Sequence, residues 1–413
     1  MSEDWINKIK LLVVAPKFPL INQPWMDTYL EQLIFNEIKF LVFSLNLSPK
    51  NYHPKVDNLK LLNYTHAYSI DKSNIFAAVI KRFRIFASLT VFFRIRRKKL
   101  LNSLSNMKLL SYILHFYAIP ESYDDIDIIH SHSEALSHRF IVLAEILNVP
   151  LVVTFHGLPP RGVQQLSAEK REELYRYVQK VIVNTNFAKK QVIAFGCSPE
   201  KIEVLPQGLP IENFLFNPAP VPGKGEPLRM LSVGRFHRDK GQHYSLLALK
   251  RLLIDGICAH WSFVGSGPDL AKLKELVHKL NIHDHVTFYE NVSPEELSCL
   301  YSKCHIFVLA SIDTPGGHVE TQGVVLQEAQ ASGCLVIASR TGGIPECLSH
   351  KNDSILIKSQ SSKAIYSAIK YFSFNSEDWG VYRQNGLLNV KQNFCSRVVG
   401  GKMAKLLEKG KRQ

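Results

Sequence analysis

The chain has 413 residues, of which 46% are hydrophobic and 21% charged, with a formal net charge of +14 at pH 7. This length is enough for two domains, each with its own core, and the composition excludes a disordered chain. No apolar segment of 18 or more residues occurs, so we expect no membrane span. The run LLVVAP near the start is short and follows acids and lysines, which predicts a strand and not a signal peptide. Seven scattered cysteines without a C-x-x-C pair indicate reduced thiols in a cytosolic protein.

The first half of the chain alternates short apolar runs with helical patterns. After the run KLLVVAP, the spacing predicts a helix from about Trp25 to Ile38 and a strand at FLVFSLN. Further strands are predicted at DIDIIHSH, VPLVVTFHG and KVIVNTN. Such alternation is typical of a parallel sheet with helices on both faces. Residues 1–205 are therefore expected to form an N-terminal Rossmann-like domain.

The positive charge is concentrated in one segment of that half. From Lys72 to Lys108 there are ten Lys or Arg, and no Asp or Glu lies between Asp71 and Glu121. Residues 75–100 place apolar side chains at helical spacing among the cations, which predicts a helix at an anionic membrane surface. The alternative is a stripe that packs on its own domain, with the charges solvated. The cations concerned are Lys81, Arg82, Arg84, Arg94, Arg96, Arg97, Lys98 and Lys99.

The second half begins after a stretch rich in Pro and Gly. Residues 206–227 lack helical periodicity and are interpreted as an interdomain linker. Strands and helices alternate again over residues 228–385, which predicts a second Rossmann-like domain. One of these helices has Ser293 as its cap, Pro294 at its first position and Glu296 completing a capping box. Residues 386–413 are expected to form a C-terminal helix that returns toward the first domain, so the fold class is α/β with two Rossmann-like domains.

Three glycine loops follow strands of the second half. In parallel sheets, ligands bind at the carboxyl ends of the strands, where glycine loops and helix N-termini face an anion. The loop SVGRFHRDKG places Arg235 and Lys240 near a helix start after Gly234, and two such cations suit a diphosphate, although solvated surface charges would look the same. The loops FVGSGPD and HVETQG end later strands of the same sheet. All three are therefore expected to converge on one crevice.

The third loop raises the question of two acids, Glu320 and Glu328. Eight positions separate them, which spans up to about 12 Å in a helix. That distance is comparable to the one from a hexose across a diphosphate to a ribose, so one acid could bind sugar hydroxyls and the other ribose hydroxyls. The alternative is that Glu320 lies in a solvated first turn and Glu328 on the exposed side of an amphipathic helix.

Together these residues resemble the retaining, nucleotide-sugar-dependent glycosyltransferases of family 4, which have the GT-B fold. The resemblance covers nearly the whole chain and is sharpest from about residue 228 to 357. The family's E-x7-E element is matched by Glu320 and Glu328. It is preceded by Val233, Gly234, Arg235, Lys240 and Gly241, and followed by a glycine turn at Gly342 and Gly343. In this fold the two domains face a central cleft, with the acceptor bound mainly by the first and the nucleotide sugar by the second.

The resemblance also implies roles for single residues. Arg235 and Lys240 would hold the diphosphate, Glu328 the ribose and Glu320 the transferred sugar. The amides after Gly323, those of Val324 and Val325, would face the sugar and phosphate. His156, in the stretch FHG after a strand, is similar to the family's histidine that contacts the sugar near the reacting carbon. The family needs no metal and no other cofactor.

Several features depart from the family or point elsewhere. No glycine pair follows the first strand, Glu290 and Asn291 replace a usual glycine, and the linker has QGLP where an asparagine-glycine pair is frequent. The stretch DDID (residues 124–127) resembles a metal-binding D-x-D but leads into a strand. His130, His132 and His138 could suggest a metal cluster, but no acid or cysteine stands at ligand spacing.

The sequence therefore predicts a glycosyltransferase that moves a hexose or related sugar to a glycan or lipid-linked acceptor in surface polysaccharide biosynthesis. A UDP-sugar is favoured and GDP-mannose is a second possibility. The enzyme is expected in the cytoplasm, peripheral on the inner face of the cell membrane. A GT-B-fold epimerase or phosphorylase is an alternative, as is a basic nucleic-acid-binding protein. No nucleic acid is expected, because the basic segment lacks an interleaved recognition motif.

Overall fold

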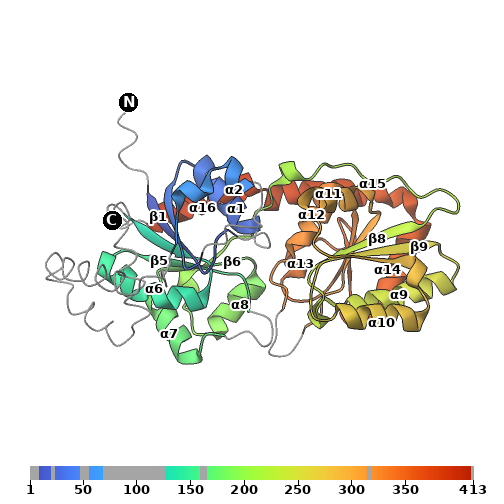
Figure 1. Ribbon diagram of the computed structural model, residues 1–413, viewed down its shortest axis with the longest axis horizontal. Helices are drawn as coiled ribbons and strands as arrows, with labels where there is room; N and C mark the ends of the chain where they lie inside the picture. Colours follow the sequence, from blue (N-terminus) through green and yellow to red (C-terminus); the bar gives the residue numbers. More distant parts are fainter. Residues whose placement is uncertain are drawn as a thin grey trace, which may run out of the picture.

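The computed structural model describes most of the chain, in the ranges 9–19, 24–46, 55–67, 126–158, 165–313 and 319–410. Within them the chain forms two lobes that lie side by side, the first blue to green with the red helix α16 added, and the second yellow to red (Figure 1). Each lobe holds one parallel sheet between layers of helices. None of the helices in these ranges has both the length and the apolar character that a membrane crossing needs.

The sheet of the first lobe has the strand order β3-β2-β1-β4-β5-β6-β7, and every neighbouring pair is parallel. Helices cover both faces, so its central strands are buried, and β1 and β5 read as nearly continuous apolar runs. The strands are β1 (Lys10–Ala15), β2 (Lys39–Ser44), β3 (Thr65–Ala67), β4 (Ile128–Ser131), β5 (Leu151–Phe155), β6 (Lys180–Val183) and β7 (Ile202–Val204).

The helices of this lobe come from distant parts of the chain. Leu12 and Val14 of β1 pack with α6, α7 and α8 on one face, whereas Leu11 and Val13 pack with α1 and α16 on the other. The core of the lobe is thus completed by α16, the last described helix. The bounds are α1 (Pro24–Phe35), α2 (Lys55–Asn58), α6 (Glu134–Leu147), α7 (Ala168–Tyr177), α8 (Asn186–Ala194) and α16 (Ser396–Gly410).

The sheet of the second lobe has the order β10-β9-β8-β11-β12-β13, again with parallel neighbours only. Helices α9, α10 and α14 cover one face, and α11, α12 and α13 cover the other. The strands are β8 (Leu228–Val233), β9 (Ala259–Val264), β10 (Val286–Tyr289), β11 (Ile306–Leu309), β12 (Leu335–Ser339) and β13 (Ile355–Ile357). The helices are α9 (Gln242–Ile254), α10 (Leu270–Leu280), α11 (Pro294–Lys303), α12 (Val324–Ser332), α13 (Ile344–Cys347) and α14 (Ser362–Phe374). The capping box of α11, with Ser293 and Glu296, is present as predicted.

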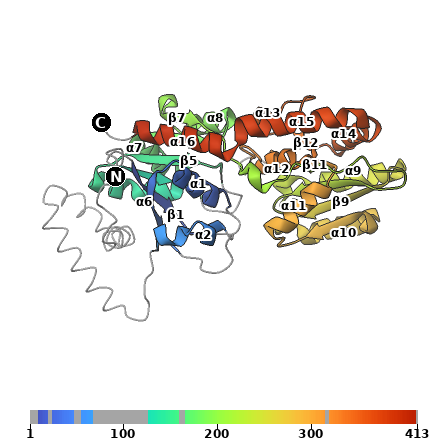
Figure 2. The same ribbon diagram turned by 90° about the horizontal axis from the view of Figure 1, so that it is seen from above.

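Two segments cross between the lobes next to each other. Residue 209 of the linker stretch pairs with the chain just before α16: Leu209 N donates to Phe394 O at 2.6 Å, and Ser396 N donates to Leu209 O at 2.8 Å. The helix expected over 386–413 is therefore divided. Helix α15 (Trp379–Asn389) lies on the second lobe, a π-helical turn (Val390–Phe394) follows, and α16 lies on α1 of the first lobe (Figure 2). The contact with the linker occupies the Phe394 carbonyl, which accounts for the break.

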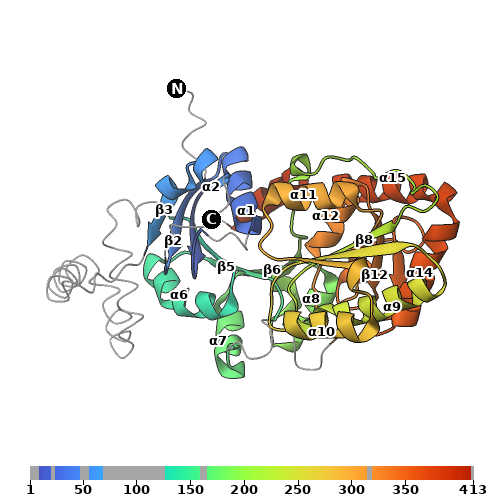
Figure 3. The ribbon, with the colours of Figure 1, turned by 45° about the vertical axis from the view of Figure 1, so that its right-hand side comes forward.

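The two-domain α/β architecture expected from the sequence is confirmed. The strand order reverses between β1 and β4 in the first sheet and between β8 and β11 in the second. In open parallel sheets, the crevice at the carboxyl ends beside such a reversal is where ligands bind. Helix α1 of the first lobe faces α11 and α12 of the second across the space between the lobes (Figure 3).

Candidate active site

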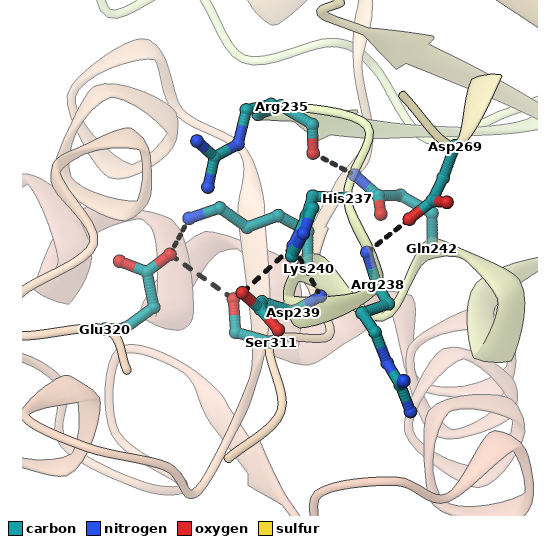
Figure 4. A network of polar contacts seen from close by, with 9 residues as sticks. All are labelled: Arg235, His237, Arg238, Asp239, Lys240, Gln242, Asp269, Ser311 and Glu320. Carbon is teal, nitrogen blue, oxygen red and sulfur yellow. Dashed lines mark hydrogen bonds and ion pairs between the residues drawn. The ribbon is translucent and has the colours of Figure 1, made fainter. Parts of the chain in front are cut away.

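The loop after β8 presents two cations at the carboxyl end of the second sheet. Arg235 is exposed, and a 3-10 turn (Arg238–Lys240) leads into α9. A Cβ on Gly234 would lie 3.8 Å from side-chain carbons of Lys240, so the lysine runs alongside the loop. Figure 4 shows the Arg235 and Lys240 side chains directed toward Glu320, whereas the Arg238 side chain points away from it.

Close backbone contacts hold the three glycine loops together. A Cβ on Gly265, in the loop after β9, would lie 2.2 Å from the Gly234 carbonyl oxygen. One on Gly241, whose φ is 65°, would lie 2.0 Å from the carbonyl oxygen of Ala310, which follows β11. Only glycine fits backbone contacts this close. The three loops therefore meet at the carboxyl end of the sheet as predicted, and the third of them lines the crevice between the lobes.

Glu320 is buried in this crevice. Only 9% of the residue is exposed, and its carboxylate forms an ion pair with the Lys240 ammonium and accepts a hydrogen bond from Ser311 Oγ at 3.4 Å (Figure 4). The Glu320 carbonyl accepts a hydrogen bond from Gly343 N at 2.8 Å, and a Cβ on Gly342 would collide with the same carbonyl. The glycine turn after β12 thus fixes the backbone of Glu320, which is not a solvated first-turn acid.

His156 reaches the same crevice from the first lobe. It follows β5, and its carbonyl accepts a hydrogen bond from Thr321 Oγ1 at 3.4 Å. Burial lowers the pKa of His156 to about 4, so the ring is neutral at pH 7. A cavity of about 340 Å³ lies between the lobes at this point, and we call it the sugar-side cavity. Its lining residues come from both lobes and from the linker: Trp25, His132, His156, Asn184, Gln207, Glu320, Thr321, Gln322, Gly323 and Val324.

Glu328 lines a second, larger cavity of about 610 Å³ that also lies between the lobes. Its carboxylate accepts a hydrogen bond from the Tyr301 hydroxyl at 2.8 Å. Burial raises the pKa of Glu328, and this hydrogen bond opposes the rise. Val324 and Trp25 line both cavities, so the two are neighbours. Of the predicted amide-bearing residues Val324 lines the cavities, whereas the Val325 side chain packs against the apolar core.

The histidines considered as a metal cluster separate into two places. His130 and His132 lie beside His156, with the His132 Nδ1 atom 3.2 Å from His156 Nε2. His138 lies apart and contacts Glu173, with 2.7 Å between Nε2 and the carboxylate. Across the described ranges, no group of three or more His, Cys, Asp or Glu side chains is arranged to hold a metal ion.

Comparison with known proteins places the chain in a family. The family model described as "Glycosyltransferase Family 4" matches residues 71–213, and that described as "Glycosyl transferases group 1" matches residues 216–386. The chain belongs to the family-4 type of GT-B glycosyltransferases.

Relatives of this glycosyltransferase occur in several bacteria. It is 26% identical over 288 residues to the amylovoran biosynthesis glycosyltransferase AmsK of Erwinia amylovora, a match that covers 69% of this chain and 70% of AmsK. It is 24% identical over 266 residues to WcaL of Salmonella typhimurium, which is named for colanic acid biosynthesis. This match covers 64% of this chain and 65% of WcaL, so the chain spans just under two thirds of that relative. Among solved structures, Anabaena HepE in complex with UDP matches with a TM-score of 0.70 over 97% of this chain and all of HepE; at 16% identity this likeness shows the fold.

The site of this glycosyltransferase contains residues that the sequence did not single out. Trp25 is the second residue of α1, and its ring centroid lies 4.4 Å from that of His156. Gln322 accepts a hydrogen bond from Gln207 N at 2.7 Å and donates one to Gln207 O at 3.0 Å, which ties the linker to the loop bearing Glu320. A signal for Gln207 was present in the sequence, because the linker has QGLP where the family often has an asparagine-glycine pair. No local pattern marked Trp25, because its position depends on how α1 packs.

One predicted feature lies outside the described residues. The basic segment and its cations, from Lys81 to Lys99, fall within a range that the structure does not describe. The membrane-surface helix therefore stays a prediction.

Proposed function

We propose that this glycosyltransferase moves a hexose or related sugar from a nucleotide sugar to a glycan or lipid-linked acceptor, with retention of configuration. The observation that carries the proposal is that Glu320, which is ion-paired with Lys240, lines one cavity together with His156 of the other lobe. A transferred sugar needs hydroxyl-binding groups on one side and a stabilised leaving group on the other. Glu320 and His156 line the sugar-side cavity, and the ion pair with Glu320 holds the Lys240 cation next to it.

The charged part of the nucleotide sugar would be bound by the loops of the second lobe. Arg235 and Lys240 supply two cations, and guanidinium and ammonium groups bind phosphate oxygens well. Gly323, with a φ of 78°, is the N-cap of α12, so the amides of Val324 and Val325 lie in the first turn of this nine-residue helix. Such a turn carries unsatisfied N–H groups and partial positive charge, which favours an anion.

The uncharged parts of the nucleotide sugar would be bound by the two acids and the histidine. Glu328, at the larger cavity, would accept hydrogen bonds from ribose hydroxyls. Glu320 would bind hexose hydroxyls together with His156 from the other lobe. Since sugar hydroxyls both donate and accept hydrogen bonds, carboxylates and a neutral imidazole are suitable partners.

The chemistry proposed for the site is dominated by leaving-group stabilisation. The bond from the anomeric carbon to the diphosphate breaks, the acceptor oxygen bonds to that carbon on the same face, and the departing diphosphate takes the acceptor's proton. No protein nucleophile or base is needed in this sequence of events. Arg235, Lys240 and the α12 amides would stabilise the charge that develops on the diphosphate, which is an effective form of catalysis in a site shielded from water. We expect no metal and no other cofactor to take part.

The named relatives support the setting of the reaction. AmsK and WcaL are named for the biosynthesis of amylovoran and colanic acid, so we propose that this enzyme also acts in surface polysaccharide biosynthesis. HepE was solved in complex with UDP, which favours a UDP-sugar, and GDP-mannose is the comparison to include.

A thermal-shift panel followed by product analysis tests the proposal. A nucleotide sugar at a hundred times its dissociation constant adds about 2.7 kcal/mol to stability, so UDP- and GDP-sugars can be ranked by the shift they cause. The best nucleotide sugar is then incubated with a glycan acceptor, and NMR of the product reports the anomeric configuration. Product formed without any acceptor, or with phosphate alone, would show an epimerase or a phosphorylase instead.

We further propose that the enzyme acts in the cytoplasm at an anionic membrane surface. The support is the charge of the basic segment, where each cation near such a surface contributes about 1 kcal/mol of attachment. Binding to vesicles should require anionic lipid and weaken with salt. Co-sedimentation measures this. Equal binding to neutral vesicles, or full binding after Arg96, Arg97, Lys98 and Lys99 are changed to Ser, would contradict it.

A further inference from the structure

His132 stands beside His156 and has no role in the function proposed above. It follows β4, and its ring lies nearly parallel to that of His156, at 19° and 5.5 Å between centroids. The nitrogen pair that joins them is His132 Nδ1 and His156 Nε2, 3.2 Å apart. Trp25 contacts both rings, at 4.4 Å from His156 and 5.1 Å from His132. The three rings therefore form one packed unit on the first-lobe wall of the sugar-side cavity.

Both imidazoles of this unit are neutral at pH 7. Burial lowers the pKa of His156 to about 4. Burial also lowers the pKa of His132 well below its ordinary value, and the neighbouring rings of His130 and His156 lower it further. A neutral imidazole carries one N–H and one bare nitrogen. A contact between two ring nitrogens is then a hydrogen bond in one direction only.

The surroundings of His132 decide that direction. Its Nε2 atom is buried and has no hydrogen-bond partner among the described residues. His130 cannot supply one, because its nitrogens contact the Tyr29 hydroxyl at 2.5 Å and Thr154 Oγ1 at 2.8 Å. A proton on His132 Nε2 would be a buried, unsatisfied N–H, which proteins avoid more strictly than a bare acceptor. The proton of His132 therefore belongs on Nδ1.

We propose that His132 is a positioning residue that donates a hydrogen bond from Nδ1 to His156 Nε2, so that His156 carries its own proton on Nδ1 and donates it to an oxygen of the transferred sugar. A second group that fixes the tautomer of a functional histidine is a common device. Glu320 on the opposite wall offers hydrogen-bond acceptors. A sugar hydroxyl between them can accept from His156 and donate to Glu320. The use of this tautomer rests on the proposed function, whereas the tautomer itself does not.

Two substitutions of His132 separate hydrogen bonding from packing. His132→Phe keeps an aromatic ring beside Trp25 and removes the N–H, and His132→Asn places an amide N–H near the Nδ1 position. His138→Phe is the matched control, because His138 lies away from the cavity. We expect His132→Phe to lower kcat about tenfold, the loss of one useful hydrogen bond, and His132→Asn to restore most of it. UDP and GDP binding, measured by calorimetry, should not change, since these ligands lack the sugar.

Two kinetic outcomes would overturn the proposal. One is a kcat for His132→Phe equal to that of the wild type and the His138→Phe control. The other is a His132→Asn variant as slow as His132→Phe, because packing and not the N–H would then be responsible.

Nitrogen-15 NMR of the imidazole rings tests the tautomer without any turnover. In the wild-type protein we expect the proton of His156 on Nδ1, and in His132→Phe a mixture of the two tautomers. A wild-type His156 protonated on Nε2 would overturn the proposal even if the enzyme transfers sugar as proposed. A correct tautomer in a protein that transfers no sugar would instead count against the proposed function alone.

Discussion

The two walls of the cleft differ in the charge state of some of their ionisable groups. On the second-lobe wall Lys240 and Glu320 are paired, with side chains 17% and 10% exposed. On the first-lobe wall burial opposes charge at two groups, since it lowers the pKa of His156 to about 4 and raises that of Asp27 to about 7, whereas Lys55 on this wall is ion-paired with Glu31. This difference fits the proposed ligands, since the diphosphate is an anion and the sugar and acceptor hydroxyls are neutral. A cleft can thus bind one ligand with charges at one end and neutral polar groups at the other.

On the neutral wall, Asp27 is the buried carboxyl group whose ionisation lowers the stability of the folded protein. It lies in the first turn of α1, is 2% exposed, and neither carboxylate oxygen has a hydrogen-bond partner among the described residues. Lys55 favours its ionised form electrostatically but forms its ion pair with Glu31. A buried carboxylate without a direct partner lowers the stability of the fold when it ionises.

Removing a cation from the charged wall should have the largest effect. We expect Lys240→Ala or Arg235→Ala to lower kcat about a hundredfold or more, because each removes charge stabilisation of the leaving diphosphate worth roughly 2.7 to 4 kcal/mol. Steady-state kinetics measures this, with circular dichroism to check folding. Arg238→Ala is the matched control from the same loop, and its side chain points away from Glu320 (Figure 4). Activity near that of the control in both variants would remove the diphosphate assignment.

On the neutral wall, Asp27→Asn should stabilise the protein, and more so at high pH. The pKa of Asp27 is raised from 3.8 to about 7 in the folded protein. The folded state therefore binds the proton more tightly, and stability is lost as pH rises from about 4 to about 7. The total loss in the free energy of unfolding over this pH range is up to about 4 kcal/mol. The buried amide of the variant has a desolvation cost of its own, so we expect a net gain of about 2 kcal/mol at pH 8.

Urea denaturation at pH 5 and pH 8 measures the effect of Asp27→Asn. The gain should be clearly smaller at pH 5, where the wild-type carboxyl is mostly protonated. Asp57→Asn on α2, an exposed acid nearby, is the control. An equal change at both pH values would mean that the carboxyl of Asp27 does not titrate in this range.

The smallest of the three effects should separate the two acids of the charged wall. Glu328→Ala should weaken binding of UDP or GDP about tenfold, because it removes hydrogen bonds to ribose. Glu320→Ala should leave this binding nearly unchanged and chiefly lower kcat, because its partners are on the sugar. Calorimetry with the sugarless nucleotide distinguishes them, and Glu275→Ala on the exposed face of α10 is the control. Equal weakening by Glu320→Ala and Glu328→Ala would refute the division between sugar and ribose.

The sequence by itself determined the fold and the charged wall. Strands alternating with helices predict parallel sheets, and the ends of parallel strands meet at one edge. The sequence therefore places Arg235, Lys240 and Glu320 at one edge of one sheet, and the structure adds that their strands, β8 and β11, are neighbours. The start of α16 was misplaced by about ten residues, because the break before it depends on the Phe394 contact with the linker.

The sequence marked His156, but only the tertiary structure decided how the neutral wall is assembled around it. Trp25 lies near a helix start, more than a hundred residues before the two strand ends that carry His132 and His156, and no periodicity records how α1 packs beside them. The direction of a pKa shift depends on burial and neighbours, which are properties of the assembled fold. The same residue types in a loop exposed to water would have ordinary pKa values. The chemistry of this wall therefore follows from packing, whereas that of the opposite wall follows from strand order.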